Sequence, residues 1–121
     1  MPRLFSLLAV FWLAALPAPA RAFDKVQDKK AFLSLMQGRE LWLGLFRVSL
    51  QVLPDGKITG SALGTPVAGT WNWRDGYFCR QLTWRSREIG FNCQLVEAKG
   101  TQQMRFTVDR GAGNSATFRL R

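Results

Sequence analysis

The sequence contains no histidine, only two cysteines, and only 8 acidic residues against 17 basic ones. Without histidine it can form neither a Ser-His-Asp triad nor a Cys-His pair, so these forms of nucleophilic catalysis are excluded. Two cysteines alone supply too few ligands for a zinc site. The acidic residues are scattered along the chain, which disfavours metal catalysis. We therefore predict no metal and no cofactor, and a non-catalytic protein is favoured over an enzyme.

Long apolar runs are also lacking, except for one at the N-terminus. Residues 4–16 form an apolar run of thirteen residues, which is too short to span a bilayer comfortably. A basic residue precedes the run, a proline ends it, and Ala-Arg-Ala at 20–22 has the form of a cleavage site. We predict a signal peptide at 1–22 and one domain at 23–121, periplasmic or secreted, with no transmembrane segment after cleavage. An uncleaved anchor helix is the alternative.

Negative charge is scarce in the predicted exported domain. Two of the 17 basic residues and none of the 8 acidic ones precede residue 23, which leaves 15 against 8 and a net charge of +7. Such an excess suits an anionic partner such as a membrane surface, a lipid head group or a polysaccharide, although solubility alone also explains it. No nucleic-acid-binding motif is present. We predict an envelope partner of anionic character and no nucleic acid.

Cys79 and Cys93 are predicted to form a structural disulfide. Export favours a disulfide, and the spacing is not the Cys-x-x-Cys of a redox site. The flanking segments YFCRQLTW and REIGFNCQLV have the composition of strands. A three-residue turn at 85–87 places the two cysteines directly opposite each other, close enough to bridge. Closing a loop of this size contributes roughly 3 kcal/mol to stability.

A short helix is predicted between Asp28 and Gly38. Asp28 is a suitable N-cap and Gly38 a suitable C-terminal stop. Phe32, Leu35 and Met36 share one helical face by their i, i+3, i+4 spacing, and we interpret this face as a contact with the core.

From residue 41 onward, apolar and polar residues alternate, with a turn about every ten residues. Pro54-Asp55-Gly56 predicts a three-residue hairpin loop that pairs Val52 with Ile58. The side chains predicted to face inward on the last two strands are Met104, Phe106, Val108, Ala116, Phe118 and Leu120. The predicted fold class is mainly β, with a short N-terminal helix followed by seven or eight antiparallel strands in a meander. The strands form a small barrel or a sandwich with one disulfide.

The turn at Asp75-Gly76 determines which side chains face the core. A two-residue turn pairs Trp73 with Phe78, whereas a three-residue turn pairs Trp73 with Tyr77. Only the second register gives one continuous apolar face, and register normally follows such a face. We therefore predict the second register. The apolar face that it creates contains Trp71, Trp73, Tyr77, Cys79, Ile89, Phe91, Cys93 and Leu95.

The opposite face of the cysteine hairpin is the first candidate binding surface. Aromatic, arginine and amide side chains alternate there, and such residues anchor contacts with sugars, aromatic ligands or proteins. The alternative is that the helix or a second sheet covers this face and makes its aromatic residues part of the core. The candidate residues are Phe78, Arg80, Trp84 and Asn92.

The glycine-rich connection between the last two strands is the second candidate site. Successive backbone amides in such a loop can form a nest that binds an anion. It is not a nucleotide-binding phosphate loop, because no helix and no Gly-Lys-Ser/Thr motif follows it. The alternative is an ordinary connection. The candidate residues are Arg110, Gly111, Gly113 and Asn114.

Several segments give the chain a family resemblance. RELWLGLFRVSLQVLPDGKITGSALG, GTWNWRDGYFCR, FNCQLV and RFTVDRGAGNSATFRLR resemble a family of short exported alphaproteobacterial proteins of the Rhodobacter and Roseobacter group. Members often carry the automatic label dihydrodipicolinate reductase. The resemblance covers the whole of 23–121 and implies an envelope location. It does not imply the reductase reaction, because the chain lacks the Gly-x-Gly-x-x-Gly turn of a nucleotide-binding domain.

A non-catalytic binding or accessory domain of the envelope is therefore the function that the sequence favours. One alternative is a structural protein without a small ligand. Another is an inhibitor of an envelope hydrolase, although the net charge of +7 disfavours a strongly basic target. The last alternative is an enzyme, including the labelled reductase.

Overall fold

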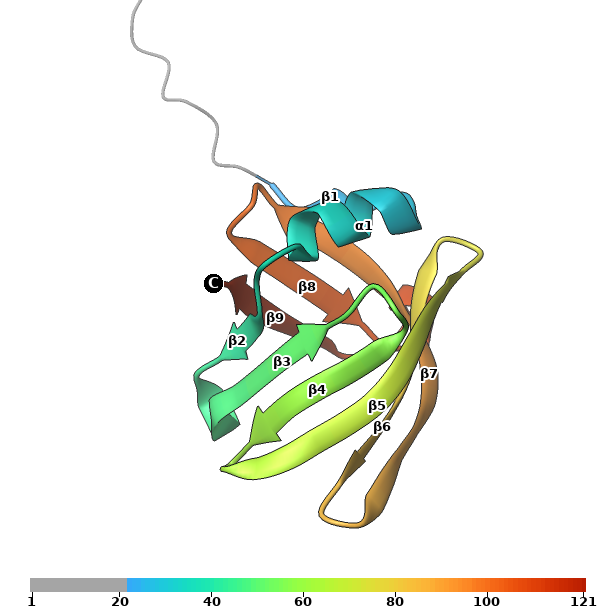
Figure 1. Cartoon of the computed structure of the whole chain (residues 1–121). Helices are drawn as coiled ribbons and strands as arrows, with labels where there is room; N and C mark the ends of the chain where they lie inside the picture. The colour runs from blue at the N-terminus through green and yellow to red at the C-terminus, as the bar shows by residue number, and fades with distance from the viewer. Residues whose placement is uncertain (1–21) are drawn as a thin grey trace, which may run out of the picture.

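A computed structural model describes residues 22–121, which form a closed β-barrel with a helix over one end (Figure 1). Within this range, strands β2 to β9 follow one another as an antiparallel meander, and β9 pairs with β2 to close the sheet. A short additional strand, β1, pairs with the C-terminal half of β7. The predicted mainly β class is confirmed, as a barrel and not a sandwich. All but the last residue of the predicted signal peptide lies outside the described residues.

The elements are β1 (Asp24–Lys25), α1 (Lys29–Met36), β2 (Leu41–Leu43), η1 (Leu45–Arg47), β3 (Val48–Val52), β4 (Lys57–Ala62), β5 (Thr65–Arg74), β6 (Tyr77–Trp84), β7 (Arg87–Lys99), β8 (Gln103–Thr107), η2 (Asp109–Gly111) and β9 (Ser115–Leu120). Strand β7 is long enough to pair with β6 along its first half and with β8 along its second half. Strand β7 therefore connects β6 to β8 within the closed sheet.

Helix α1 closes one end of the barrel, as its apolar face predicted. The carboxylate of Asp28 accepts a hydrogen bond from the backbone N of Ala31 at 2.9 Å, which caps the first turn. The chain leaves the helix through Gly38, whose φ of 70° lies in the left-handed region that glycine adopts easily. Phe32 and Met36 are buried, at 0 % and 3 % exposed. The predicted helix and its core contact are confirmed.

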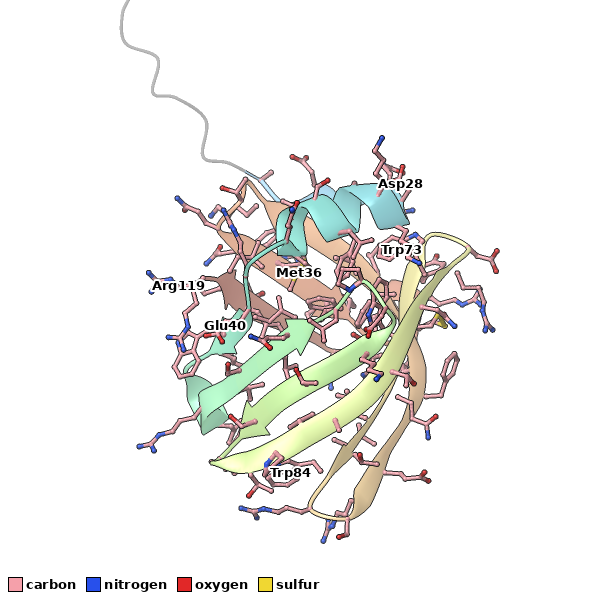
Figure 2. The ribbon with its side chains drawn as sticks, in the orientation of Figure 1. Asp28, Met36, Glu40, Trp73, Trp84 and Arg119 are labelled. Carbon is pink, nitrogen blue, oxygen red and sulfur yellow. A yellow bond between two sulfur atoms is a disulfide. The ribbon has the colours of Figure 1, made fainter. Side chains whose placement is uncertain are left out.

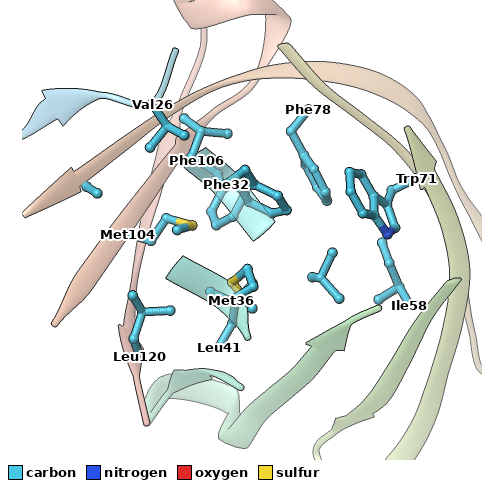
Figure 3. Packing of buried hydrophobic residues seen from close by; sticks show 13 residues of the cluster. Val26, Phe32, Met36, Leu41, Ile58, Trp71, Phe78, Met104, Phe106 and Leu120 are labelled. Atoms are coloured by element: carbon cyan, nitrogen blue, oxygen red, sulfur yellow. The ribbon is translucent and has the colours of Figure 1, made fainter. Parts of the chain in front are cut away.

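An aromatic cluster fills the barrel below the helix (Figure 3). The ring of Phe32 lies 5.3–5.4 Å, centroid to centroid, from the rings of Trp71, Trp73 and Phe78. It also lies 6.4 Å from Phe106 in an edge-on arrangement. Aromatic pairs in these geometries attract one another beyond the effect of area burial. The helix is therefore part of the barrel's core.

Two parts of the predicted strand pattern are confirmed closely. The β3–β4 connection is the three-residue loop expected at Pro54-Asp55-Gly56, with Val52 opposite Ile58 and Gly56 at φ 93°. On β8 and β9 the expected inward positions are buried or partly buried. The alternate positions of β9 are exposed, whereas on β8 Gln103 and Arg105 are partly buried and Thr107 is buried. Both predictions depended on local sequence patterns, and the tertiary contacts of the barrel leave the predicted local structures unchanged.

The predicted register of the β5–β6 turn is wrong. The turn has two central residues, Asp75 and Gly76, at φ 53° and 87°, and it pairs Trp73 with Phe78. Such a turn matches the right-handed twist of the flanking strands. The one-residue difference turns Phe78 into the barrel, where Phe32 covers it, and puts Tyr77 on the other face of β6.

The predicted cysteine pairing is confirmed, although the turn that leads to it is shorter than predicted. The β6–β7 turn consists of Arg85 and Ser86 alone, so Trp84 lies opposite Arg87. Cys79 and Cys93 nevertheless face each other and form a disulfide, with Cα atoms 3.9 Å apart.

A β-bulge reconciles the shorter turn with the cysteine pairing. Between the pairs Leu82–Ile89 and Arg80–Asn92, strand β7 contains one residue more than β6. The bulge interrupts the alternation of β7, and Phe91 within it is 55 % exposed. Ile89 is 40 % exposed. The prediction that these two side chains belong to a continuous apolar core face is therefore wrong.

Gly69 marks a close approach between β5 and β6. A Cβ atom at this position would lie 2.2 Å from the carbonyl O of Gln81 and 2.7 Å from Cδ2 of Leu82. We expect Gly69→Ala to lower the free energy of unfolding by about 1–3 kcal/mol, because the strands must separate to admit the methyl group. Urea denaturation measures this loss. Gly90→Ala is the matched control, since a Cβ at Gly90 meets nothing within 4 Å, and equal losses in both variants would contradict the close approach.

Candidate functional site

The barrel contains a cavity of about 290 Å³ between the aromatic cluster and the β8–β9 connection. Its walls are mostly apolar, with a few polar groups, and this composition is typical of small-ligand sites. An eight-stranded barrel is just wide enough either to be filled by side chains or to hold one small ligand. The lining residues are Leu41, Leu50, Val52, Ile58, Phe78, Arg80, Leu82, Gln94, Phe106, Val108, Asn114, Ser115, Ala116 and Phe118.

The cavity adjoins the aromatic cluster through Phe78 and Phe106, which are among its lining residues. On β9, the small side chain of Ala116 leaves space that a larger side chain would occupy. Gly60 and Gly69 do not leave such space, because a Cβ atom there would lie 1.9 Å from the carbonyl O of Ser49 and 2.2 Å from that of Gln81.

Arg80 brings a positive charge into this cavity. Its guanidinium Nη1 donates to the carbonyl O of Gly90 at 2.6 Å. Burial lowers the pKa of Arg80, although a guanidinium remains protonated at neutral pH. Neither of the ion pairs found within residues 22–121 includes Arg80. The guanidinium is partly buried and has no acidic partner within residues 22–121, so an anion placed in the cavity would pair with it favourably.

Three uncharged polar residues complete the lining. Gln94 lies opposite Phe78 on the neighbouring strand and is only 6 % exposed. Asn114 and Ser115 enter from the β8–β9 connection and the start of β9. The hydroxyl of Ser115 is already hydrogen-bonded to that of Thr107 at 2.6 Å. Arg80, Gln94 and Asn114 therefore supply the hydrogen-bond donors for a bound group. The arrangement can orient a small anion, and the apolar walls can bury the rest of such a ligand.

The four residues of the first predicted site do not lie on one surface in the structure. Arg80 lines the cavity, as a binding residue should, but on the inner face of the barrel and not on an outer face. Phe78 is 4 % exposed and belongs to the core, so its prediction as a surface residue is wrong. The error follows from the β5–β6 turn, whose true length turns Phe78 and Arg80 inward.

The other two residues of that site hold the barrel's connections in place. The indole Nε1 of Trp84, which is partly buried, donates to the carbonyl O of Ala62 at 3.0 Å. The side chain of Asn92 donates to Asp109 Oδ1 at 2.8 Å and accepts from the Asp109 backbone N at 3.0 Å. Trp84 thereby links β6 to the end of β4, and Asn92 links β7 to η2.

The second predicted site, the glycine-rich connection, is folded on itself. The amides of Gly111 and Gly113 both donate to the carbonyl O of Val108, at 3.1 and 3.0 Å. The guanidinium of Arg110 lies 5.2 Å from the centroid of the Tyr77 ring. An anion nest in this loop stays a prediction, and the internal hydrogen bonds do not favour it. Asn114 is the member of this set that lines the cavity.

Gln94 and Ser115 are lining residues that the sequence did not reveal. Gln94 is a polar residue at an inward position, and that position is apparent only once Cys93 is known to face outward. The other signal is the small side chain of Ala116 at an inward position, which indicates missing volume only when the strands are aligned.

A second hollow is an open groove of about 900 Å³ between α1 and β3, which we call the helix groove. Its lining combines apolar side chains with charged ones, including Lys29 and Lys30. Glu40 accepts hydrogen bonds from Ser49 at 2.8 Å and from Arg121 at 2.6 Å, and these two bonds lower the pKa of Glu40. The charge of this acidic residue is therefore already neutralised within the protein, unlike the charge of Arg80.

Comparisons with known proteins identify no relative. Neither a scan against protein-family models nor searches of curated proteins and of solved structures found a match. Within residues 22–121, no group of three or more cysteine or acidic residues is placed to hold a metal ion. Nor does any helix in that range have the length and apolar character needed to cross a membrane.

Proposed function

We propose that this protein is a non-catalytic binding protein of the cell envelope that holds a small amphipathic anion inside its barrel. The observation that carries the proposal is Arg80, a cation without an acidic partner within residues 22–121, in a cavity with otherwise apolar or uncharged walls. A carboxylate would pair with the guanidinium through charge-assisted hydrogen bonds. The disulfide supports an oxidising compartment such as the envelope.

The size of the cavity limits the ligand. At about 290 Å³, it lies at the lower end of the range for small-molecule sites. A carboxylate on a short hydrocarbon chain or on a single ring suits this volume, whereas a whole phospholipid does not. Medium-chain carboxylates such as octanoate are therefore suitable probes.

The composition of the lining favours binding over catalysis. Of the residues that line the cavity, Arg80 is the one ionisable side chain. General acid–base catalysis needs a group that exchanges protons near neutral pH, and arginine does not do so. The same argument disfavours the reductase and other enzymes among the alternatives.

Arg80→Met is expected to separate binding from stability. The variant keeps the apolar stem and removes a partly buried charge that forms no ion pair within residues 22–121, so the free energy of unfolding should stay nearly constant. Octanoate affinity should fall at least tenfold, because a hydrogen bond to a charged group contributes about 1.5–3 kcal/mol. Urea denaturation and titration of tryptophan fluorescence measure the two effects.

Arg80→Lys is the control that keeps the charge but loses the paired donors of the guanidinium. It should bind octanoate more tightly than Arg80→Met and less tightly than the wild type. The proposal is contradicted if Arg80→Met binds octanoate as tightly as the wild type. It is also contradicted if the wild type shows no saturable binding.

A further inference from the structure

Exposed apolar side chains lie on two neighbouring connections at the end of the barrel opposite α1 (Figure 1). Leu45 and Phe46 on η1 are 66 % and 58 % exposed, and Leu63 in the β4–β5 turn is 47 % exposed. The connections touch, because the backbone N of Leu63 donates to the carbonyl O of Phe46 at 2.9 Å. We call Leu45, Phe46 and Leu63 the apolar rim. Contiguous exposed apolar side chains often mark a surface that contacts a partner or a membrane.

Two residues of the apolar rim, Phe46 and Leu63, have a backbone conformation that is unfavourable for large side chains. Phe46 has a φ of 65° and Leu63 a φ of 52°, in the left-handed region that bulky residues rarely adopt. Leu63-Gly64 forms a two-residue hairpin turn, and asparagine or glycine is the usual residue at the position of Leu63. The chain therefore carries large apolar groups where small polar residues would fold more easily. This conflict between local preference and sequence points to a role for the side chains themselves.

Arginine residues surround the apolar rim. Arg47 is the last residue of η1, Arg85 lies on the β6–β7 turn, and Arg87 is the first residue of β7; all three are exposed. The indole of Trp84, over which Arg85 stacks at 4.3 Å, donates to the carbonyl O of Ala62 and so joins this turn to the β4–β5 turn. Figure 2 shows Trp84 at the end of the barrel away from α1. The three connections thus form one continuous surface that is both apolar and basic.

We propose that this surface docks on a bilayer that contains anionic phospholipids. The apolar rim would enter the boundary between head groups and acyl chains, and the three arginines would meet the lipid phosphates. Interfacial protein segments combine apolar and basic residues in this way. The three connections, all within residues 22–121, contain no carboxylate, and the neighbouring acidic residue in the sequence is Glu88 on β7, so the local charge complements an anionic surface. A second copy of the chain suits this surface poorly, because its arginines would repel each other.

This docking goes beyond the proposed function and does not depend on it. The test uses residues 22–121, which contain the closed sheet, the helix and the disulfide and therefore the whole core. We expect this protein to bind vesicles of phosphatidylglycerol and phosphatidylcholine, and to release them as salt is added, because salt screens the arginines. Vesicles of phosphatidylcholine alone should bind at least tenfold more weakly.

The double substitution Phe46→Asn and Leu63→Asn tests the apolar rim directly. Asparagine tolerates the left-handed backbone, so the variant should unfold at the same or a higher urea concentration than the wild type. Its affinity for the anionic vesicles should nevertheless fall at least tenfold. A residue that served folding alone would not show this opposite pair of effects. Phe91→Ala, which removes an exposed aromatic ring outside the apolar rim, is the control and should bind the vesicles as the wild type does.

The proposal is overturned if the wild type ignores anionic vesicles, or if the double variant binds them as tightly as the wild type. Self-association of the wild type that the same double substitution abolishes would also overturn it, because the apolar rim would then be an interface between copies. Octanoate titration of the double variant should match that of the wild type, because the apolar rim residues do not line the cavity. Failure of docking and failure of ligand binding are therefore distinguishable.

Discussion

Replacing Phe32 with alanine is expected to lower the free energy of unfolding by roughly 3–5 kcal/mol. Phe32 is fully buried at 0 % exposed, and its ring lies within 5.3–5.4 Å of the rings of Trp71, Trp73 and Phe78. Truncation would leave a cavity where the helix meets the barrel, and strands β5 and β6, which carry these rings, cannot collapse around it without breaking their pairing. The loss would remove a large part of the stability that a small domain has.

Urea denaturation followed by tryptophan fluorescence measures this loss, because Trp71 and Trp73 contact the deleted ring. Lys30→Ala on the same helix is the matched control, since Lys30 is exposed. An exposed substitution usually changes stability by less than about 0.5 kcal/mol. If Phe32→Ala costs no more than Lys30→Ala, helix α1 is not an integral part of the core.

Loss of the Cys79–Cys93 disulfide is the second large effect. The double substitution to alanine should lower the free energy of unfolding by roughly 3 kcal/mol, as expected for a closed loop of this length. The bond joins β6 to β7 just beyond the β-bulge, where the strand pairing is interrupted. Without it, the outer part of this hairpin should open before the rest of the barrel.

Calorimetry of the oxidised protein, of the reduced protein and of the alanine double variant tests this expectation. The reduced protein and the double variant should melt at similar temperatures, both well below the oxidised protein. Mass spectrometry should detect no free thiol in the oxidised form, because the structure has no free cysteine within residues 22–121. Equal melting temperatures for all three forms would show that the bond does not stabilise the barrel.

Elements with local signals were predictable from the sequence. The cap at Asp28, the glycine of the β3–β4 loop and the strict alternation of the last two strands each specify their own geometry. The turns at Asp75-Gly76 and Arg85-Ser86 were harder. The first allows two lengths, and the second has none of the glycine or asparagine residues that usually identify a two-residue turn. The β-bulge in β7 then corrected the second error, which is why the cysteine pairing was still predicted correctly.

The cavity depends on residues that are far apart in the sequence. Arg80 was a predicted binding residue, but the sequence placed it on the outside because the register of β5 against β6 was off by one residue. The lining residues come from β2, β3, β4, β6, β7, β8 and β9, so the cavity forms only when these strands close into one barrel. No local pattern encodes that closure, so Gln94 and Ser115 could not be recognised as residues that line the same cavity as Arg80.

The location of a bound carboxylate tests the central claim most directly. In an NMR titration of residues 22–121 with octanoate, the side-chain amides of Gln94 and Asn114 should shift saturably with one ligand per protein. The backbone amides of Lys29 and Lys30 in the helix groove should not shift. Octylammonium, which has the same chain length and the opposite charge, should produce no saturable shifts at the cavity. Saturable shifts confined to the helix groove, or equal shifts with both ligands, would contradict a cavity built around Arg80.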